Sequence, residues 1–435
     1  MASRKNKGLL GLMLIYVAAF LIASLMTGSI GESFEGLGRI ITSPSQLTKD
    51  YFKLGGVSAA YLNTAIIAFM NFAVHALSGS SLNGLSLIAF FLITGFGFFG
   101  INPMNMVPGF LGTLLFSKVT KTKFASVANV SILSAALGPI VSEMLFRYPV
   151  DTLGLPDVWP VRIVLGVGLG VLAGFLMPIL YPNRPNLHKN YSLYNGSPAA
   201  GLISVALTSI IFRCNGLEMP NNTDVGGSHR LVVCTFAVCV ALVVILVGFM
   251  ANDRRFRRFG DLLRSSSYCC DHVEEFGIPL VFVNNGVFLL GFLIYYNLVG
   301  PDMMTGPTMG AMICALACTG CGGHIVNMIP TMLGYLAASA LSPALTASSQ
   351  PLLAGLSFAA ALCPVSGRYG ALLGVVAGML HAAIVQNVMA FHGGFSVLNG
   401  GFTVMFVTMM LIPIYQYFFE VRQTPGILPV LKKRG

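Results

Sequence analysis

Two short stretches of this largely apolar chain combine helix-breaking residues with polar side chains. They are residues 94–109, with Asn102 and Asn105, and residues 319–330, with His324 and Asn327. Glycines and prolines interrupt a helix, and a helix that ends at membrane depth turns free N–H groups toward an anion or free carbonyl groups toward a cation. Amide and imidazole groups add hydrogen-bonding partners for a small solute or a coupling ion. We therefore predict a binding site at these stretches; helices that are only kinked and packed through small residues are the alternative.

The two stretches belong to an internal duplication. The segment Asn105-Met-Val-Pro108-x-x-x-Gly112 recurs in the second half of the chain as Asn327-Met-Ile-Pro330-x-x-x-Gly334. Further pairs keep the same order: Asn63 with Asn284 and Pro139 with Pro364 at similar displacements, and His188 and Asn195 with His392 and Asn399 at a smaller one, because the first copy carries extra residues around 149–160. Because the landmarks keep one order, we infer two homologous halves, residues 8–213 and 230–420, followed by a basic cytoplasmic tail of residues 421–435.

The composition places the chain in a membrane. Of its 435 residues, 55% are hydrophobic and only 9% are charged, against about 25% charged residues in an ordinary soluble domain. A soluble enzyme of this length needs more charged surface, so we expect lipid to be the main solvent. The net charge of +10 accompanies no basic module for nucleic acid, and we attribute it to membrane topology.

These features predict an all-α polytopic membrane protein built from two inverted-topology repeats. Each repeat should contain about five spanning helices and a re-entrant or broken hairpin. Residues 32–53 and 253–275 mix charged and apolar residues at helical spacing, so we expect each to form an interfacial amphipathic helix. A plain loop outside the membrane is the alternative for these two segments.

The distribution of Lys and Arg predicts that the two halves are inverted. The basic leader before residue 8, the cluster at 118–123 after the first hairpin and the tail at 432–434 mark the cytoplasmic side. The corresponding loop after the second hairpin, residues 341–350, carries no charge, which marks it as outside. One half therefore begins inside and the other outside. We expect a bacterial cytoplasmic membrane, with both termini in the cytoplasm.

Ionisable residues follow each hairpin. On the register of the shared prolines, Glu143 of the first half corresponds to Arg368 of the second, and Ser142 and Ser366 stand close by. A charge at the centre of a membrane costs about 3 kcal/mol unless it is paired or hydrated. Glu143 and Arg368 could pair across the axis that relates the halves, or Arg368 could meet an anionic solute while Glu143 handles a proton or cation. Snorkelling of both side chains to the membrane surface is the alternative.

Polar residues shared by the halves extend the candidate set. Asn63 and Asn284, the latter followed by Asn285, carry amides that fit a site for Na⁺ or a polar solute and equally fit contacts between helices. We assign four more residues to possible secondary sites: His188, Asn195, His392 and Asn399. We expect the two histidines in exposed loops rather than in a proton relay.

The spacing Cys314-x-x-x-Cys318-x-x-Cys321 is similar to that of an iron–sulfur motif. In the first half the equivalent positions are Leu92, Phe96 and Phe99, which are apolar. We therefore assign the cysteines a structural role and predict no metal site and no cofactor. The nine cysteines fit reduced thiols in a cytoplasmic membrane.

At the level of the paired motifs, the chain resembles a family of uncharacterised bacterial integral-membrane proteins with a duplicated domain, over almost its whole length. That resemblance implies no known activity. The layout of surface helix, hairpin and broken span also resembles elevator-type secondary transporters and, more loosely, urea-transporter-like channels. Both are likenesses of architecture and not of signature residues.

The function that we predict from these observations is transport of a small polar or anionic solute by alternating access, coupled to Na⁺ or H⁺. In this hypothesis the two hairpin tips meet near the midplane and gate opposite faces. A passive channel for a small polar solute is the alternative, and an enzyme is not expected because no paired acidic, zinc or nucleophile–base motif is present. The predicted partners are the lipid bilayer, the transported solute or ion and further copies of the chain in a dimer or trimer, with no nucleic acid.

Overall fold

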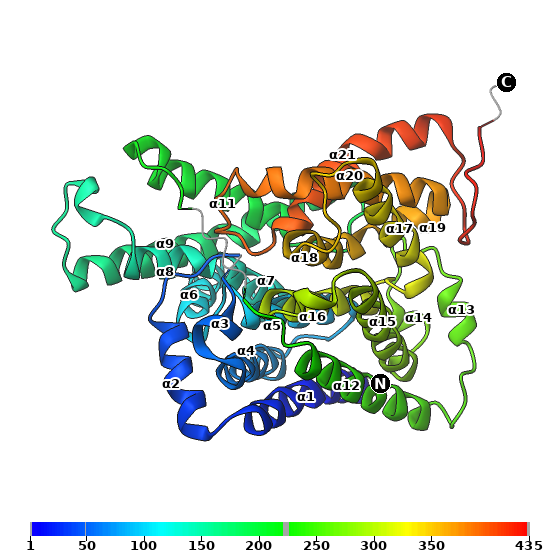
Figure 1. Ribbon diagram of the computed structural model, residues 1–435, viewed down its shortest axis with the longest axis horizontal. Helices are drawn as coiled ribbons and strands as arrows, with labels where there is room; N and C mark the ends of the chain where they lie inside the picture. The colour runs from blue at the N-terminus through cyan, green and yellow to red at the C-terminus, as the bar shows by residue number, and fades with distance from the viewer. Residues whose placement is uncertain (1, 48, 221–225, 433–435) are drawn as a thin grey trace.

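The computed structural model describes residues 2–47, 49–220 and 226–432 (Figure 1). In this part of the chain the regular structure is helical, apart from one isolated bridge between Phe419 and Leu431. Within these described ranges, ten helical stretches are long and apolar enough to cross a membrane, five in each half. They are Lys5–Thr27, Val57–Leu77, Phe124–Phe146, Trp159–His188, Ser197–Asn215, Arg230–Ala251, Ile278–Val299, Gln350–Tyr369, Ala371–Met389 and Asn399–Phe418. The predicted class, an all-α polytopic membrane protein, is therefore confirmed.

The helices of the two halves follow one another in the same order. The first half contains α1 (Ala2–Thr27), α2 (Ile30–Ile41), α3 (Tyr51–Gly55), α4 (Val57–Leu77), α5 (Gly84–Gly95), α6 (Pro103–Val119), α7 (Phe124–Ser134), α8 (Gly138–Phe146), α9 (Trp159–Leu180), α10 (Arg184–His188) and α11 (Ser197–Ile211). The second contains α12 (Arg230–Ala251), α13 (Phe259–Leu263), α14 (His272–Glu275), α15 (Ile278–Val299), α16 (Gly306–Ala315), α17 (Ile325–Leu341), α18 (Gln350–Ala359), α19 (Cys363–Tyr369), α20 (Ala371–Met389) and α21 (Asn399–Phe418).

Equivalent helices make equivalent packing contacts. Helix α1 packs along α4 as α12 packs along α15, and α6 packs along α9 as α17 packs along α20. One span in each half is broken by a short 3₁₀ turn, Ala135–Leu137 between α7 and α8 and Ala360–Leu362 between α18 and α19. The prolines of the shared motif directly follow these turns, where the missing N–H is tolerated at the start of a helix. The two broken spans lie mostly in the interior of the molecule.

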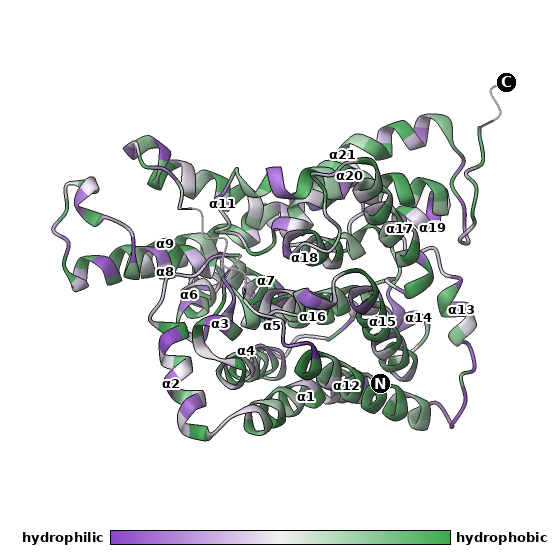
Figure 2. Cartoon of the chain, viewed as in Figure 1, coloured by the Kyte–Doolittle hydropathy of each residue, from purple (hydrophilic) through white to green (hydrophobic). Residues whose placement is uncertain are grey.

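The outer helices expose apolar side chains. Helices α1 and α12 are hydrophobic along most of their length (Figure 2), and Ile22, Leu25, Leu231 and Leu246 on them are more than half exposed. An apolar surface of this extent is unusual for a soluble protein but normal against lipid. The helices α5 and α16, in contrast, are buried along their whole length except at Leu85.

Helices α5 and α16 cross at the centre of the molecule in antiparallel directions. A Cβ built on Gly95, at the end of α5, would lie 2.4 Å from the carbonyl oxygen of Gly310 near the start of α16. At the other end of the crossing, a Cβ built on Gly84 would lie 2.3 Å from the carbonyl oxygen of Gly320. Since α5 and α16 are equivalent elements of the two repeats, their antiparallel contact means that the halves are inverted relative to each other.

Equivalent residues meet on the axis of this arrangement. The thiol of Cys314 donates to the carbonyl oxygen of Leu92 over 3.3 Å, and these two residues are 222 positions apart. The same displacement takes Asn105 to Asn327 in the repeated motif. A residue touches its own equivalent only where a twofold axis passes between them. The contact of Gly84 with Gly320 is also repeated. The same displacement takes Gly84 to Gly306 and Phe98 to Gly320, and a Cβ built on Gly306 would lie 3.0 Å from the carbonyl oxygen of Phe98.

The two predicted interfacial segments differ in the structure. In the first half α2 is an amphipathic helix that buries Ser33, Gly36, Leu37 and Ile40 along one stripe. In the second half the equivalent segment contains only α13 and α14, with turns between them. Helix α13 buries only Leu262. An interfacial helix as long as the predicted range is therefore not present there, because the segment has no continuous apolar stripe to bury and several of its residues adopt left-handed φ angles: Asp253, Arg254, Arg258, Ser267 and Cys269.

Alanine at the central crossing tests this packing. We expect Gly95→Ala and Gly310→Ala each to lower the free energy of unfolding by about 1–3 kcal/mol, because the added methyl group forces two backbones apart. Gly168→Ala is the matched control, since a Cβ built on Gly168 of α9 has nothing within 4 Å, and this change should be neutral or stabilising by up to about 1 kcal/mol. Unfolding in detergent, followed by circular dichroism, measures the difference. Equal effects at all three positions would contradict the close crossing.

Candidate functional site

The first hairpin tip is organised by two asparagines at the start of α6. The side-chain oxygen of Asn102 accepts hydrogen bonds from the backbone N–H groups of Met104 (3.1 Å) and Asn105 (2.9 Å), and the side-chain oxygen of Asn105 accepts from the N–H of Asn102 (2.9 Å). This capping box satisfies the free donors of the helix end. The Asn105 amide also donates to the hydroxyl of Ser142 on α8 (2.9 Å). The structure therefore brings the predicted residues Asn102, Asn105 and Ser142 together in one buried cluster.

The second tip has a different arrangement at the equivalent positions. His324 stands at the start of α17 but makes no capping bond; its Nε2 lies 3.1 Å from the carbonyl oxygen of Ser265. The amide of Asn327 donates to the hydroxyl of Ser267 over 2.7 Å and lies 3.0 Å from Nε2 of His324. The second tip is therefore held by the loop between α13 and α14, whereas the first is held by Ser142 of α8 and, through the amide of Asn102, by the carbonyl oxygen of Ile40 on α2 (3.4 Å).

Two buried asparagines hold the helix breaks open in the same way in each half. The amide of Asn63 on α4 donates to the carbonyl oxygens of Gly97 (2.7 Å) and Ile101 (2.9 Å). The amide of Asn284 on α15 donates to the equivalent carbonyl oxygens, those of Thr319 (3.2 Å) and Gly323 (2.8 Å). The side-chain oxygens of both asparagines are buried and have no hydrogen-bond partner among the described residues. The duplication thus preserves both the bonds and the free acceptor.

Asn285 connects the two halves rather than holding the break. Its side-chain oxygen accepts from the hydroxyl of Tyr16 on α1 (2.5 Å), and its amide donates to the hydroxyl of Thr319 (3.1 Å). Helix α1 of the first half is thereby linked to the hairpin of the second. Sequence patterns did not identify Tyr16 because it has no polar neighbour in the apolar run of α1.

The two hairpin tips do not meet near the midplane, contrary to the prediction. Because α5 and α16 run antiparallel, the tip that follows α5 lies at one end of the crossing and the tip that follows α16 lies at the other. A helix of the length of α5, 12 residues, spans about 18 Å. The candidate residues consequently form one cluster in each half and not a single shared site.

Glu143 and Arg368 do not pair with each other. Nε of Arg147 lies 2.8 Å and 2.9 Å from the two carboxylate oxygens of Glu143, one helical turn away on α8. The guanidinium group of Arg368 instead lies over the ring of Tyr268, 4.6 Å from its centre. Glu143 is paired within its own half, so the ion pair across the axis is not present among the described residues. Nε of Arg368 has no hydrogen-bond partner there, and the role of Arg368 toward an anionic solute stays a prediction.

Ser366 lies beside Asn327 in a cavity of about 210 Å³ that the C-terminal segment covers. Its hydroxyl has no partner among the described residues. The tail does not simply extend away from the membrane: the carbonyl oxygen of Gly426 accepts from the N–H of Ala371 (2.7 Å) at the start of α20. The described part of the predicted tail is therefore packed on the second half.

The histidines of the secondary sites are buried, which corrects the expectation of exposed loops. His392 donates from Nε2 to the side-chain oxygen of Asn399 (3.0 Å), and Ser396 donates its N–H to Nδ1 of His392 (3.4 Å). Burial lowers the pKa of His392 to about 4, so the ring is neutral at neutral pH. Neither ring nitrogen of His188 has a partner among the described residues.

The loops that carry these histidines are buried because each packs into the opposite half. The N–H of Leu193 donates to the carbonyl oxygen of Ala361, and the N–H of Val397 donates to that of Ala136, both over 3.2 Å. The acceptors lie in the 3₁₀ turns that break the two central spans. The halves thus exchange equivalent loops, each of which supplies a donor at the other's break.

Two aspartates that the sequence analysis missed make a second exchange of this kind. Asp50 caps α3 through the N–H of Phe52 (2.8 Å) and also accepts from the N–H of Gly306 at the start of α16 (3.2 Å). Asp271 caps α14 and accepts from the N–H of Gly84 at the start of α5 (3.1 Å). Burial raises the pKa of both carboxyl groups, and the backbone donors oppose this rise. Asp50 and Asp271 could have been identified as an equivalent pair from the sequence, because their separation along the chain equals that of Asn63 and Asn284.

Removing the asparagines that hold the breaks should loosen both hairpins. We expect Asn63→Ala to lower the free energy of unfolding by about 2–4 kcal/mol, because two buried carbonyl groups lose this donor and each costs about 1–3 kcal/mol. Asn284→Ala should cost about 1–3 kcal/mol, because the carbonyl oxygen of Thr319 keeps its contact with Nδ1 of His272 (3.0 Å). Asn387→Ala is the control, since Asn387 is exposed and bonds only within its own helix, to Ala383. Unfolding in detergent gives the stability. In Asn284→Ala, maleimide should also label the buried thiol of Cys321 faster; unchanged labelling and stability would show that the bonds do not hold the break.

The comparisons with known proteins agree with a duplicated membrane protein. A family model described as "Protein of unknown function (DUF1576)" matches residues 29–213 and 251–417, in two segments that lie within the two predicted halves. Neither the curated proteins nor the solved structures gave a match. Since the matched segments make up most of the chain, the protein belongs to the DUF1576 family.

Proposed function

We propose that the protein is a secondary transporter that moves a small polar or anionic solute by alternating access, with Na⁺ or H⁺ as the coupling ion. The observation that supports this proposal is the contact between the equivalent residues Leu92 and Cys314 on the axis of two antiparallel hairpins. When two inverted halves are related by such an axis, they can exchange conformations. A conformation closed on one side of the membrane then has an equivalent conformation closed on the other side. We further propose a bacterial cytoplasmic membrane, cytoplasmic termini and a homo-oligomer.

The interfaces between the halves fit relative movement. Besides apolar packing, they contain hydrogen bonds that recur in equivalent pairs: the caps by Asp50 and Asp271 and the loop contacts of Leu193 and Val397. Other hydrogen bonds between the halves, such as that of Tyr16 with Asn285, stand outside these pairs. At the central crossing, glycines bring backbone against backbone, beside the side chains of Cys314, Cys321 and Phe99. A shift of one hairpin past the other would break the paired bonds, and the equivalent set is available to the opposite half.

Free acceptors at the helix breaks support the coupling ion. The buried side-chain oxygens of Asn63 and Asn284 have no donor among the described residues. A buried acceptor without a partner costs about 1–3 kcal/mol, and oxygen atoms of amides and backbone carbonyls are ligands that Na⁺ accepts. A bound cation or water at each break would recover that cost.

Locking the axis tests the proposal directly. In Leu92→Cys, the new thiol stands beside native Cys314, and a disulfide between them would fix the hairpins against each other. We measure uptake of a panel of labelled neutral and anionic solutes into proteoliposomes with an imposed Na⁺ or H⁺ gradient. We expect accumulation above equilibrium, its loss by at least tenfold on oxidation of the variant, and its recovery with a reductant.

The control for the lock is Leu92→Cys combined with Cys314→Ala, which cannot form the disulfide and should transport equally before and after oxidation. Equilibration that needs no gradient and survives the lock would identify a passive channel instead. Absence of flux for every solute in the panel, with folded protein, would contradict a transport function.

A further inference from the structure

Two pockets lie at opposite ends of the central crossing. The first, which we call the Asn399 pocket, has a volume of about 140 Å³ and includes Phe99, after α5, and Pro307, at the start of α16. The second, the Asn195 pocket, has a volume of about 130 Å³ and includes Leu85, at the start of α5, and Cys321, after α16. Since each pocket joins the beginning of one central helix to the end of the other, the two are separated by the length of the crossing.

The pockets are equivalent by the internal duplication. The displacement that takes Leu92 to Cys314 also converts lining residues of one pocket into lining residues of the other, in three pairs: Leu47 with Cys269, Leu85 with Pro307, and Phe99 with Cys321. The smaller displacement that takes His188 to His392 adds the pair Asn195 and Asn399. Pockets that arise by chance would not share these positions across a twofold axis.

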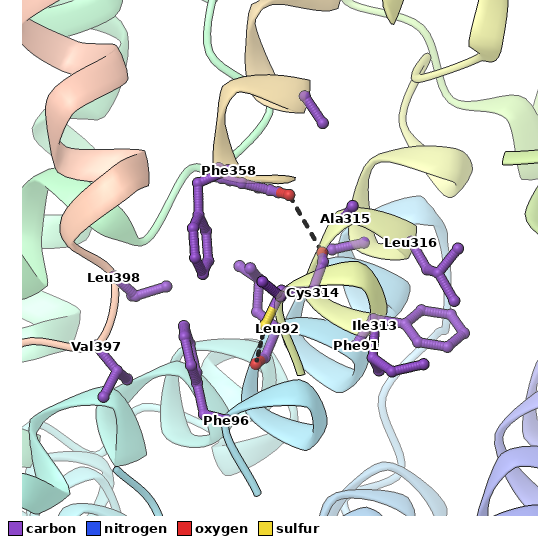
Figure 3. Packing of buried hydrophobic residues seen from close by; sticks show 14 of the residues in the cluster. Phe91, Leu92, Phe96, Ile313, Cys314, Ala315, Leu316, Phe358, Val397 and Leu398 are labelled. Carbon is purple, nitrogen blue, oxygen red and sulfur yellow. Dashed lines mark hydrogen bonds between the residues drawn. The ribbon is translucent and has the colours of Figure 1, made fainter. Parts of the chain in front are cut away.

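The core on the axis separates the two pockets. Figure 3 shows Cys314 beside Leu92, with the rings of Phe96 and Phe358 facing each other. These rings are stacked, with centres 5.7 Å apart. Phe358 lines the Asn399 pocket. The pockets therefore do not form one open channel in this conformation.

The walls offer polar groups without formal charge. Among the described residues, the polar groups of the Asn399 pocket are the amides of Gln350, Gln386 and Asn399. The Asn195 pocket has two amides, a hydroxyl and three thiols in its lining, and burial raises the pKa of the Cys270 thiol to about 11. A charged solute would lose its hydration here without meeting an opposite charge among the lining residues, which is costly. The charges of Glu275 and Arg368 that act on Cys270 have opposite signs. A cavity of about 150 Å³ admits a ligand of about six non-hydrogen atoms.

The two pockets are in different states. In the Asn399 pocket the amide of Asn399 donates to the carbonyl oxygen of Val385 (3.0 Å), and its oxygen accepts from His392. The side chain of Asn195 has no hydrogen-bond partner among the described residues and is half-buried. Its amide is therefore free to bind a solute, whereas that of Asn399 is engaged by the protein.

We propose that these pockets are the two solute chambers of the transporter, one opening to each side of the membrane, and that they take a small uncharged polar solute. The inference rests on the proposed function and narrows its substrate class from polar or anionic to uncharged. The amides of Asn195 and Asn399 then act as equivalent binding groups, each free when its own chamber receives solute. In this conformation the Asn195 chamber is ready to bind.

Thiol labelling in membrane vesicles of both orientations tests the two openings. The native thiol of Cys269 reports on the Asn195 pocket, and Leu47→Cys, with Cys269 and Cys270 replaced by serine, reports on the other. We expect a membrane-impermeant maleimide to label each thiol from one side only, and from opposite sides for the two. Labelling of both from the same side would contradict the inverted arrangement and the transport proposal with it.

A pair of reagents of equal size tests the substrate class. We compare alkylation by neutral iodoacetamide and anionic iodoacetate at Cys270 of the Asn195 pocket and at Ala354→Cys of the Asn399 pocket, with exposed Cys214 as the control. We expect the ratio of the two rates to be about tenfold higher in the pockets than at Cys214. The raised pKa of Cys270 slows both reagents alike. The negative charge of Glu275 acts on Cys270 more strongly than the positive charge of Arg368 and disfavours the anion there, so the ratio at Ala354→Cys decides the result.

The result separates the two proposals. A ratio in the pockets equal to that at Cys214, with labelling from opposite sides, would refute the uncharged substrate class and leave the transport function standing. A high ratio at both reporters, with opposite sidedness, supports the paired chambers. A high ratio with common sidedness would keep the chemistry of the pockets but reject their roles as entrance and exit.

Discussion

The close antiparallel crossing of α5 and α16 is the constraint on which the rest of the structure depends. Glycine at Gly84, Gly95, Gly310 and Gly320 allows backbone to meet backbone, and any larger residue would push the hairpins apart. Because the two helices are copies of one element, this contact also sets the direction of each half relative to the other. The inverted arrangement of the halves is thus a consequence of local packing at the centre.

The exchanged contacts connect that centre to both ends of the molecule. Asp50 joins a surface segment of the first half to the start of α16, and Asp271 does the same for α5. The loops around Leu193 and Val397 reach the breaks of the opposite central spans. Each half therefore positions the hairpin and the broken span of its partner. A change in one half alters bonds at defined points in the other, which is the physical requirement for coupled opening and closing.

The sequence alone predicted the helices and their breaks better than it predicted the contacts between them. The spans, the breaks and the amides of Asn63 and Asn284 could be identified because apolar runs, prolines and repeated motifs are local signals. Sequence patterns could not identify the separation of the hairpin tips or the burial of His188 and His392. Both depend on which half supplies the loop that packs against each helix break. In a duplicated chain, each loop could pack against the helix break of its own half or against the similar break of the other half. Residue spacing does not distinguish these two arrangements.

The equivalent His–Asn pairs of the two halves differ in their hydrogen bonds. His392 engages Asn399, whereas neither ring nitrogen of His188 has a partner among the described residues, and no hydrogen bond engages the side chain of Asn195 there. Both pairs descend from one motif, so each sequence can in principle form the bond that the other shows. If the two halves exchanged conformations, the bond between His392 and Asn399 would be broken and the equivalent bond between His188 and Asn195 would form. The energy difference between the states is then set by residues that the duplication did not preserve, such as Asn102 opposite His324 and the C-terminal segment packed on α20. In the proposed transporter, a bound solute or ion needs to supply only that difference to move the equilibrium.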